Sequence, residues 1–214
     1  MGLPRIRPRT ALVLAALALL PTLYYPEIAF LGRILASYDV FVYFYPLYAY
    51  AAETLRAGRL PLWNPYLFLG APFLANPQTG VFYPPNLIFL LVDPPRGYAI
   101  SLLLHLGLTA AATYAFARRA LGLGQPAACL ASLAFTFGGF LTGQSGHLNQ
   151  VQATAWLPVV LLLADEALQP GRRWWCVPTG VALGVQLLAG HEQETYMTGV
   201  AMGLLALYRC WQPR

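Results

Sequence analysis

The chain has 214 residues, a formal net charge of +5, 58% hydrophobic residues and only 10% charged residues. Roughly a quarter of the residues of an average soluble domain are charged, so this composition excludes an ordinary soluble domain and indicates a polytopic membrane protein. A span needs about 20 residues to cross a hydrocarbon core of roughly 30 Å, so the chain is long enough for several spans.

Six apolar runs predict an all-α, polytopic transmembrane bundle that forms a single membrane domain over residues 1–214. The expected spans cover residues 11–31, 98–117, 126–143, 151–168, 174–190 and 195–209. An arginine-rich start before the first run is also typical of a signal peptide. No cleavage site of small residues follows this run, so we expect it to remain as a span.

Arginines supply all thirteen basic charges, and most of them lie in clusters between the apolar runs. Cytoplasmic loops of membrane proteins are enriched in basic residues. If the N-terminus is cytoplasmic, six spans place these clusters on the cytoplasmic side: Arg5, Arg7, Arg9, Arg118, Arg119, Arg172, Arg173, Arg209 and Arg214. The long first loop, over residues 32–97, then lies outside.

This external loop is rich in aromatic residues and proline, and it carries Asp39 directly after the first apolar run. Residues 47–56 predict an amphipathic interfacial helix that ends at Gly58, and residues 86–92 predict a second short helix. The prolines between them predict an ordered coil. A coil near a bilayer must pack on protein or line a cavity, and we favour a cavity.

Amide side chains in the coil are candidates for binding a hydroxyl-rich ligand, because an amide both donates and accepts hydrogen bonds. The candidates are Asn64, Asn76, Gln78 and Asn86. The alternative is that these side chains only close turns, as asparagine often does.

The stretch GRLPLWNPYLFLGAPFLANPQTGVFYPPNLIFLL, preceded by an aspartate and a Tyr-Pro pair and followed by spans that end in Gly-His motifs, resembles the bacterial YfhO-type membrane proteins. These are grouped with the GT-C-like glycosyltransferases. The resemblance implies a multi-pass enzyme of the bacterial cytoplasmic (inner) membrane, with its N-terminus in the cytoplasm. Family members are longer, so the chain is expected to match their N-terminal part.

The resemblance also implies the reactants. The donor would be a sugar linked to a polyprenyl phosphate, and the acceptor a cell-envelope glycan or polymer at the extracytoplasmic face. Membrane lipids are the other expected partners, and no nucleic acid is expected.

The resemblance maps the acidic residue of the family's first external loop onto Asp39. A carboxylate beside the sugar can take the proton of the acceptor hydroxyl while the phosphate departs. It can instead help to hold Mg²⁺ or Mn²⁺, which prefer oxygen ligands. The alternative without chemistry is that Asp39 caps a helix that begins near Val40.

Two arginines of the outer loop, Arg56 and Arg59, are candidates for pairing with a lipid phosphate, since a guanidinium binds phosphate oxygens bidentately. A solvated surface, or contact with anionic headgroups, is an equally good interpretation of both.

Two Gly-His segments, GHLNQ at residues 146–150 and GHEQET at residues 190–195, close the third and fifth expected spans on the outer side. They predict a shared polar site near Asp39, with these members: His147, Asn149, Gln150, His191, Glu192 and Glu194. Hydrated helix ends are the alternative. A zinc-protease motif is excluded, because Thr195 stands where the second histidine is required.

Together these patterns predict a membrane glycosyltransferase in which Asp39 is the catalytic or metal-associated carboxylate. The alternative is a non-catalytic lipid or polysaccharide transporter, or an assembly subunit.

Overall fold

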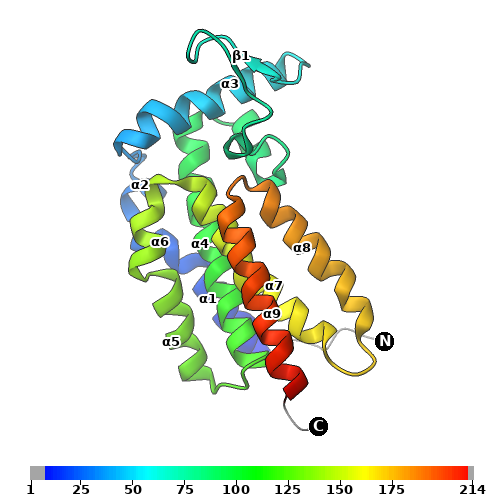
Figure 1. Cartoon of the computed structure of the whole chain (residues 1–214). Coiled ribbons are helices and arrows are strands. Elements are labelled where there is room, and N and C mark those ends of the chain that lie inside the picture. Colours follow the sequence, from blue (N-terminus) through cyan, green and yellow to red (C-terminus); the bar gives the residue numbers. More distant parts are fainter. Residues whose placement is uncertain (1–7, 212–214) are drawn as a thin grey trace.

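The computed structural model describes residues 8–211, and these residues form an all-α protein. Its helices run side by side in an elongated bundle, with the segment between α2 and α4 lying across one end (Figure 1). The described strands are limited to β1 (Trp63–Asn64) and β2 (Ala71–Pro72), which pair antiparallel. Arg5, Arg7 and Arg214 lie outside the described residues.

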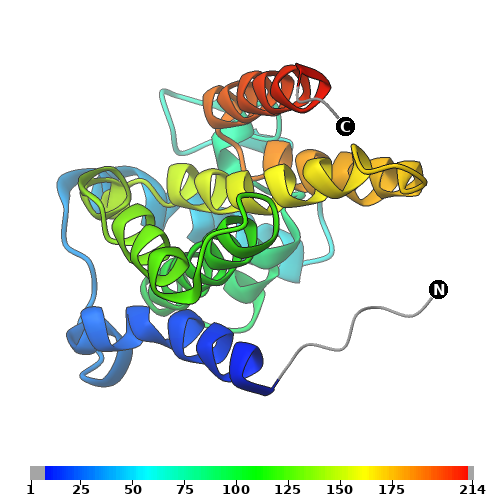
Figure 2. The ribbon, with the colours of Figure 1, turned by 90° about the horizontal axis from the view of Figure 1, so that it is seen from below.

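The bundle consists of α1 (Pro8–Tyr24), α2 (Pro26–Phe30), α4 (Pro94–Arg119), α5 (Gln125–Thr136), α6 (Gly139–Gly143), η4 (Gln144–Gly146), α7 (Leu148–Ala167), η5 (Arg173–Trp175), α8 (Cys176–Leu188) and α9 (Glu192–Trp211). Helix α4 packs against α1, α5 and α7, and α7 packs in turn against α8 and α9. Seen along the bundle, α1 and α9 lie at opposite edges (Figure 2). Each predicted apolar run therefore corresponds to helical structure.

Two helical segments are long and apolar enough to cross a membrane, Pro94–Arg119 and Gln125–Gly146. On this criterion the structure corrects the predicted count of about six spans to two within the described part of the chain. Helices α1 and α8 have 17 and 13 residues, fewer than the 20 or so that a span usually needs. Helices α7 and α9 begin with polar turns, which lower their mean hydropathy.

Small residues allow α4 to approach its neighbours closely. A Cβ atom on Gly107 would lie within 3.0 Å of the backbone oxygen of Ala18 in α1. On another side of α4, the Ser132 hydroxyl of α5 donates a 2.7 Å hydrogen bond to the Ala110 carbonyl. Close backbone contact through small residues, with hydroxyl hydrogen bonds between helices, is typical of helix packing in membranes.

Residues 31–93 form an ordered cap on the end of the bundle. The π-helical turn η1 (Val40–Phe44) leads into α3 (Tyr45–Arg56), which lies across the bundle end (Figure 1). The predicted helix over residues 47–56 is thus confirmed, and Gly58 follows its end with a φ of 70°. The rest of the cap holds the β1–β2 pair and the 3₁₀ helices η2 (Pro77–Thr79) and η3 (Pro84–Leu90), so η3 replaces the second predicted helix.

The largest hydrophobic cluster lies between the cap and the bundle. In the cap, the rings of Tyr48 and Phe89 stack with their centroids 4.2 Å apart. Tyr98 of α4 lies edge-on to Tyr48, and Leu148 of α7 completes the same cluster. The cap is therefore packed on α4 and α7 and is not a free loop.

Candidate active site at the junction of cap and bundle

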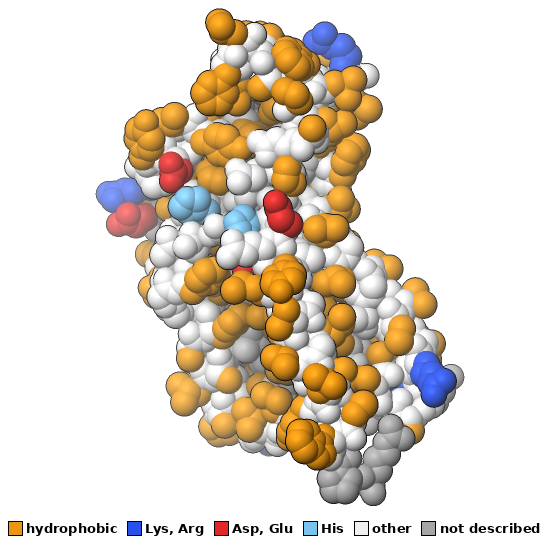
Figure 3. All heavy atoms as spheres, viewed as in Figure 1, with side chains coloured by type: hydrophobic (Ala, Val, Ile, Leu, Met, Phe, Trp, Pro, Cys, Tyr) orange, Lys and Arg blue, Asp and Glu red, His pale blue; other side chains and the backbone are white. Residues whose placement is uncertain are grey.

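Polar side chains gather at the level where the cap meets the bundle. Histidine and acidic side chains lie there above a bundle surface that is largely apolar (Figure 3). Five polar side chains contact one another there in two groups, a pair and a set of three. Together they are called the junction cluster: Asp39 with His147, and Gln150 with His191 and Glu194.

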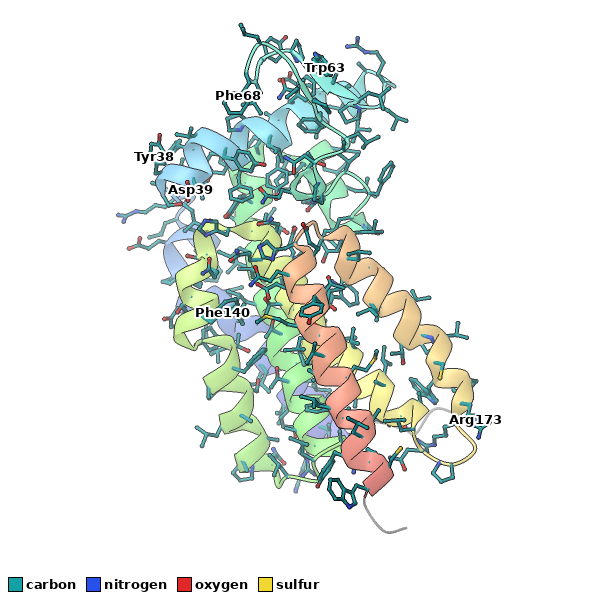
Figure 4. All side chains as sticks on the ribbon, viewed as in Figure 1. Tyr38, Asp39, Trp63, Phe68, Phe140 and Arg173 are labelled. Carbon is teal, nitrogen blue, oxygen red and sulfur yellow. The ribbon has the colours of Figure 1, made fainter. Side chains whose placement is uncertain are left out.

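Asp39 contacts His147 across the junction. The carboxylate oxygen Oδ2 of Asp39 lies 3.2 Å from Nε2 of His147, and the two side chains are 55% and 41% exposed. Asp39 precedes η1, yet its side chain makes no hydrogen bond to the start of that helix. The interpretation of Asp39 as a helix cap is therefore wrong, and its carboxylate faces the bundle instead (Figure 4).

The imidazole ring of His147 contacts two side chains of the cap, Asp39 and Phe44. His147 immediately precedes α7, and Phe44 of the cap lies edge-on to the imidazole, with ring centroids 6.1 Å apart. Among the described residues, Nδ1 of His147 is buried without a hydrogen-bond partner. Only Nε2, the nitrogen that faces Asp39, is therefore placed to exchange a proton with the carboxylate.

Gln150 and His191 form the second group. The Gln150 amide nitrogen lies 3.0 Å from Nε2 of His191, and because an amide nitrogen only donates, this ring nitrogen accepts. The proton of a neutral His191 then sits on Nδ1, which lies 3.6 Å from the Glu194 carboxylate. The structure thus brings both Gly-His segments together on the face that Asp39 occupies.

The other two residues predicted in these segments lie outside the cluster. The buried Asn149 side chain donates a 3.2 Å hydrogen bond to the Gly190 carbonyl, which ties the start of α7 to the α8–α9 turn. Glu192 is exposed in the first turn of α9. Asn149 therefore supports the site from below and does not line it.

Two of the four predicted amides of the cap, Asn64 and Asn76, close turns. The Asn64 side chain accepts a hydrogen bond from the Tyr66 N–H, and the Asn76 side chain accepts one from the Gln78 N–H. Asn64 and Asn76 line one cavity of about 60 Å³, far below the roughly 300–1,000 Å³ of ligand pockets. Gln78 is half-buried in η2. The turn-closing alternative therefore accounts for Asn64 and Asn76.

Arg56 is occupied by the protein. Its guanidinium donates to the carbonyl oxygens of Phe89 and Leu90, at 2.9 and 3.0 Å, and so holds the end of η3 against α3. Arg59 is exposed beyond the end of α3. Both arginines were candidates for binding phosphate. Arg56 thus has a structural role, and Arg59 does not contact the junction cluster.

A buried hydrogen-bond chain beneath the cluster was not predicted. Nδ1 of His105 lies 2.6 Å from the Ser101 carbonyl and must donate to it, so Nε2 accepts from the Tyr83 hydroxyl at 2.6 Å. The Trp156 indole N–H donates to the same hydroxyl at 2.8 Å. Burial raises the pKa of Tyr83 well above its ordinary value, which keeps this hydroxyl protonated and able to donate.

Gln152 extends the chain from the bundle into the cap. Its amide nitrogen donates to the Asn86 side chain at 2.7 Å and to the Ser101 hydroxyl at 3.0 Å. Asn86 donates in turn to the Gly80 carbonyl at 3.1 Å. The position of His105 inside an apolar run is the sequence signal that could have revealed these hydrogen bonds.

Metal ligands do not gather at the site. No group of three or more His, Cys, Asp or Glu side chains within residues 8–211 is placed to hold a metal ion. The Asp39 carboxylate has one imidazole beside it, and this pair does not make a metal site built by the protein.

Comparison of the chain with family models, with curated proteins and with solved structures found no match. The resemblance to YfhO-type proteins therefore stays a prediction.

Proposed function

We propose that this chain is a membrane-embedded glycosyltransferase unit whose chemistry takes place at the junction cluster. Support for the membrane location comes from two helices that are long and apolar enough to span, and from the outside of the bundle. Large apolar side chains are exposed along its helices, for example Leu104, Leu130, Val177 and Leu204. An apolar surface of this extent is unfavourable in water and suits lipid.

The topology we propose has the two long apolar segments, Pro94–Arg119 and Gln125–Gly146, crossing the membrane, with the shorter helices packed beside them. The turns bearing Arg118, Arg119, Arg172 and Arg173 then face the cytoplasm, as the positive-inside rule requires. The cap and the junction cluster then lie on the extracytoplasmic side. The membrane is the bacterial inner membrane, as the resemblance implies.

The contact between Asp39 and His147 is the observation that carries the enzymatic proposal. Transfer requires the acceptor hydroxyl to give up its proton as its oxygen attacks the anomeric carbon. Asp39 takes this proton, and the bond between the anomeric carbon and the phosphate oxygen breaks, with the electron pair leaving on the phosphate. His147 donates to Asp39 through Nε2 and so positions the carboxylate.

The reactants follow from the same proposal. A donor linked to polyprenyl phosphate would reach the site along the apolar bundle surface, and a glycan acceptor of the cell envelope would reach it from the water. The side chains of Asp39 and His147 are both partly exposed, so both are accessible from outside the protein.

Replacing Asp39 by Asn tests the proposal. The full chain in lipid nanodiscs would be supplied with polyprenyl-phosphate-linked glucose, mannose or arabinose in separate reactions, each together with purified cell-envelope glycan as the acceptor. The released polyprenyl phosphate would be measured by mass spectrometry. General-base catalysis contributes about 10²–10⁴-fold, so Asp39→Asn should lower release at least about 100-fold. Glu53→Gln, which removes an exposed carboxylate of α3, should leave the rate unchanged.

Unchanged release by Asp39→Asn, with wild-type folding by circular dichroism, would refute the catalytic assignment. A transporter or assembly subunit is the alternative, and it would release no polyprenyl phosphate in either protein.

A further inference from the structure

A cavity of about 510 Å³ lies between the segment that follows α1 and the first turns of α4. Its volume falls within the range of roughly 300–1,000 Å³ that is typical of ligand pockets. One wall is made by residues 28–34, and the other by Asp93 and the first turns of α4 as far as Leu103. It is separate from the Asp39–His147 pair, since neither residue lines it.

The cavity combines apolar walls with two guanidinium groups. Ile28, Ile100 and Leu103 line it, together with Arg33 and Arg96. The two arginines come from different elements, one after α2 and one in the first turn of α4.

The guanidinium of Arg96 has no hydrogen-bond or ion-pair partner among residues 8–211. Its backbone N–H donates to the Asp93 carboxylate, but within the described chain its side chain makes no hydrogen bond or ion pair. Arg33 donates one 3.1 Å bond to Glu27 and has further N–H groups left. Unmatched donors beside an apolar pocket are complementary to an anion attached to an apolar body.

We propose that this cavity binds the phosphodiester headgroup of a membrane phospholipid, with the phosphate between Arg33 and Arg96 and an acyl chain along Ile100 and Leu103. The inference rests on the proposed membrane location and not on sugar transfer. Asp93 lines the same cavity and Glu27 pairs with Arg33, so the charges of the two arginines are partly balanced. The two carboxylates repel a doubly charged phosphate more strongly than a singly charged one, so the site suits a phosphodiester better than a phosphate monoester.

The position of the cavity fits this ligand. It lies at the N-terminal end of α4, a 26-residue helix long enough to span, so a spanning α4 places the cavity at headgroup depth. It lies at the same end of the bundle as the cap, and its phospholipid would fill the space between α2 and α4.

Native mass spectrometry of the detergent-purified full chain tests the proposal. The wild type should retain dioleoyl-phosphatidylglycerol and should not retain dioleoylglycerol, which has the same chains without the phosphate. The double variant Arg33→Gln/Arg96→Gln should bind the phospholipid about tenfold more weakly, because hydrogen bonds between charged groups are lost. Both arginines are exposed, so the double variant should fold normally, which circular dichroism checks.

Arg173→Gln is the matched control. It removes the same charge from an exposed position at the opposite end of the bundle, where Figure 4 labels Arg173, and should bind the phospholipid as the wild type does. Equal binding of phosphatidylglycerol by the double variant would overturn the proposal, and so would equal retention of dioleoylglycerol by the wild type. Full displacement of the lipid by millimolar inorganic phosphate would show a free-phosphate site and overturn the lipid assignment. Asp39→Asn should retain the lipid, which separates this result from any failure of the transferase proposal.

Discussion

The three histidines of the chain lie in three different environments. His105 is buried in α4, where its two ring nitrogens bond Ser101 and Tyr83. His147 is partly exposed and contacts a carboxylate, and His191 accepts from an amide and points its other nitrogen toward Glu194. Only His147 combines solvent access with close contact to a carboxylate, and this makes it the histidine best placed to assist proton transfer.

Gly190 allows the α8–α9 turn to touch the cap. Its φ is 85°, and a Cβ atom there would lie within 3.0 Å of the Pro77 carbonyl oxygen. Gly190→Ala should therefore combine left-handed backbone strain with displacement of the cap, and should lower the free energy of unfolding by more than about 3 kcal/mol. Chemical unfolding in detergent micelles, followed by circular dichroism, measures this loss.

Gly171 provides the control for strain without collision. Its φ is 75°, and a Cβ atom there would have nothing within 4 Å. Gly171→Ala should cost only the backbone strain, about 1–2 kcal/mol. If both variants lost the same stability, the close contact between Gly190 and Pro77 would not exist in the protein.

At the scale of the elements, the crossing of α1 and α4 depends on Gly107. Alanine is about 1 kcal/mol more favourable than glycine inside a helix. At position 107, however, a Cβ atom would collide with the Ala18 backbone, so glycine fits this position better. Gly107→Ala should push α1 away from α4 and lower the midpoint of thermal unfolding, despite the gain in helix propensity.

Gly203 in α9 is the matched helical control, because a Cβ atom there would have nothing within 4 Å. Gly203→Ala should keep or raise the midpoint. A rise in the midpoint for Gly107→Ala as well would argue that α1 does not pack on α4 in this way.

The helices could be predicted from the sequence, because apolar runs and proline positions act locally. Proline-free residues 47–56 predicted most of α3 in this way. The contact of Gln152 with Asn86 joins residues 66 positions apart, and no local pattern indicates it. The turn-closing roles of Asn64 and Asn76 also could not be chosen over ligand binding, since both use the same amide atoms. The span count failed because a packed helix can be apolar yet shorter than a bilayer.

For the whole molecule, the orientation of the bundle can be tested on either side of α8. Gln193 and Arg173 are exposed beyond its two ends and can each be replaced by Cys in a chain whose Cys129, Cys176 and Cys210 are changed to Ser. In intact cells, an impermeant maleimide should label Gln193→Cys, while Arg173→Cys should react only after the membrane is broken.

This labelling is a sharp test because α8 has only 13 residues. If both positions react in intact cells, the two ends of α8 do not lie on opposite sides of a membrane and the proposed orientation of the bundle is wrong. Reaction of Arg173→Cys alone would invert the face on which the cap and the junction cluster lie.

The hydrogen-bond chain through Gln152, His105 and Tyr83 fastens the cap to α4 and α7. Lifting the cap would leave the His105 imidazole, the Gln152 amide and the Trp156 indole without their hydrogen-bond partners in the cap, which carries a large free-energy penalty. We therefore expect the cap to stay packed on α4 and α7 and not to open as a lid. Any molecule that contacts Asp39 and His147 would therefore have to approach from the side of the junction, where both side chains are partly exposed.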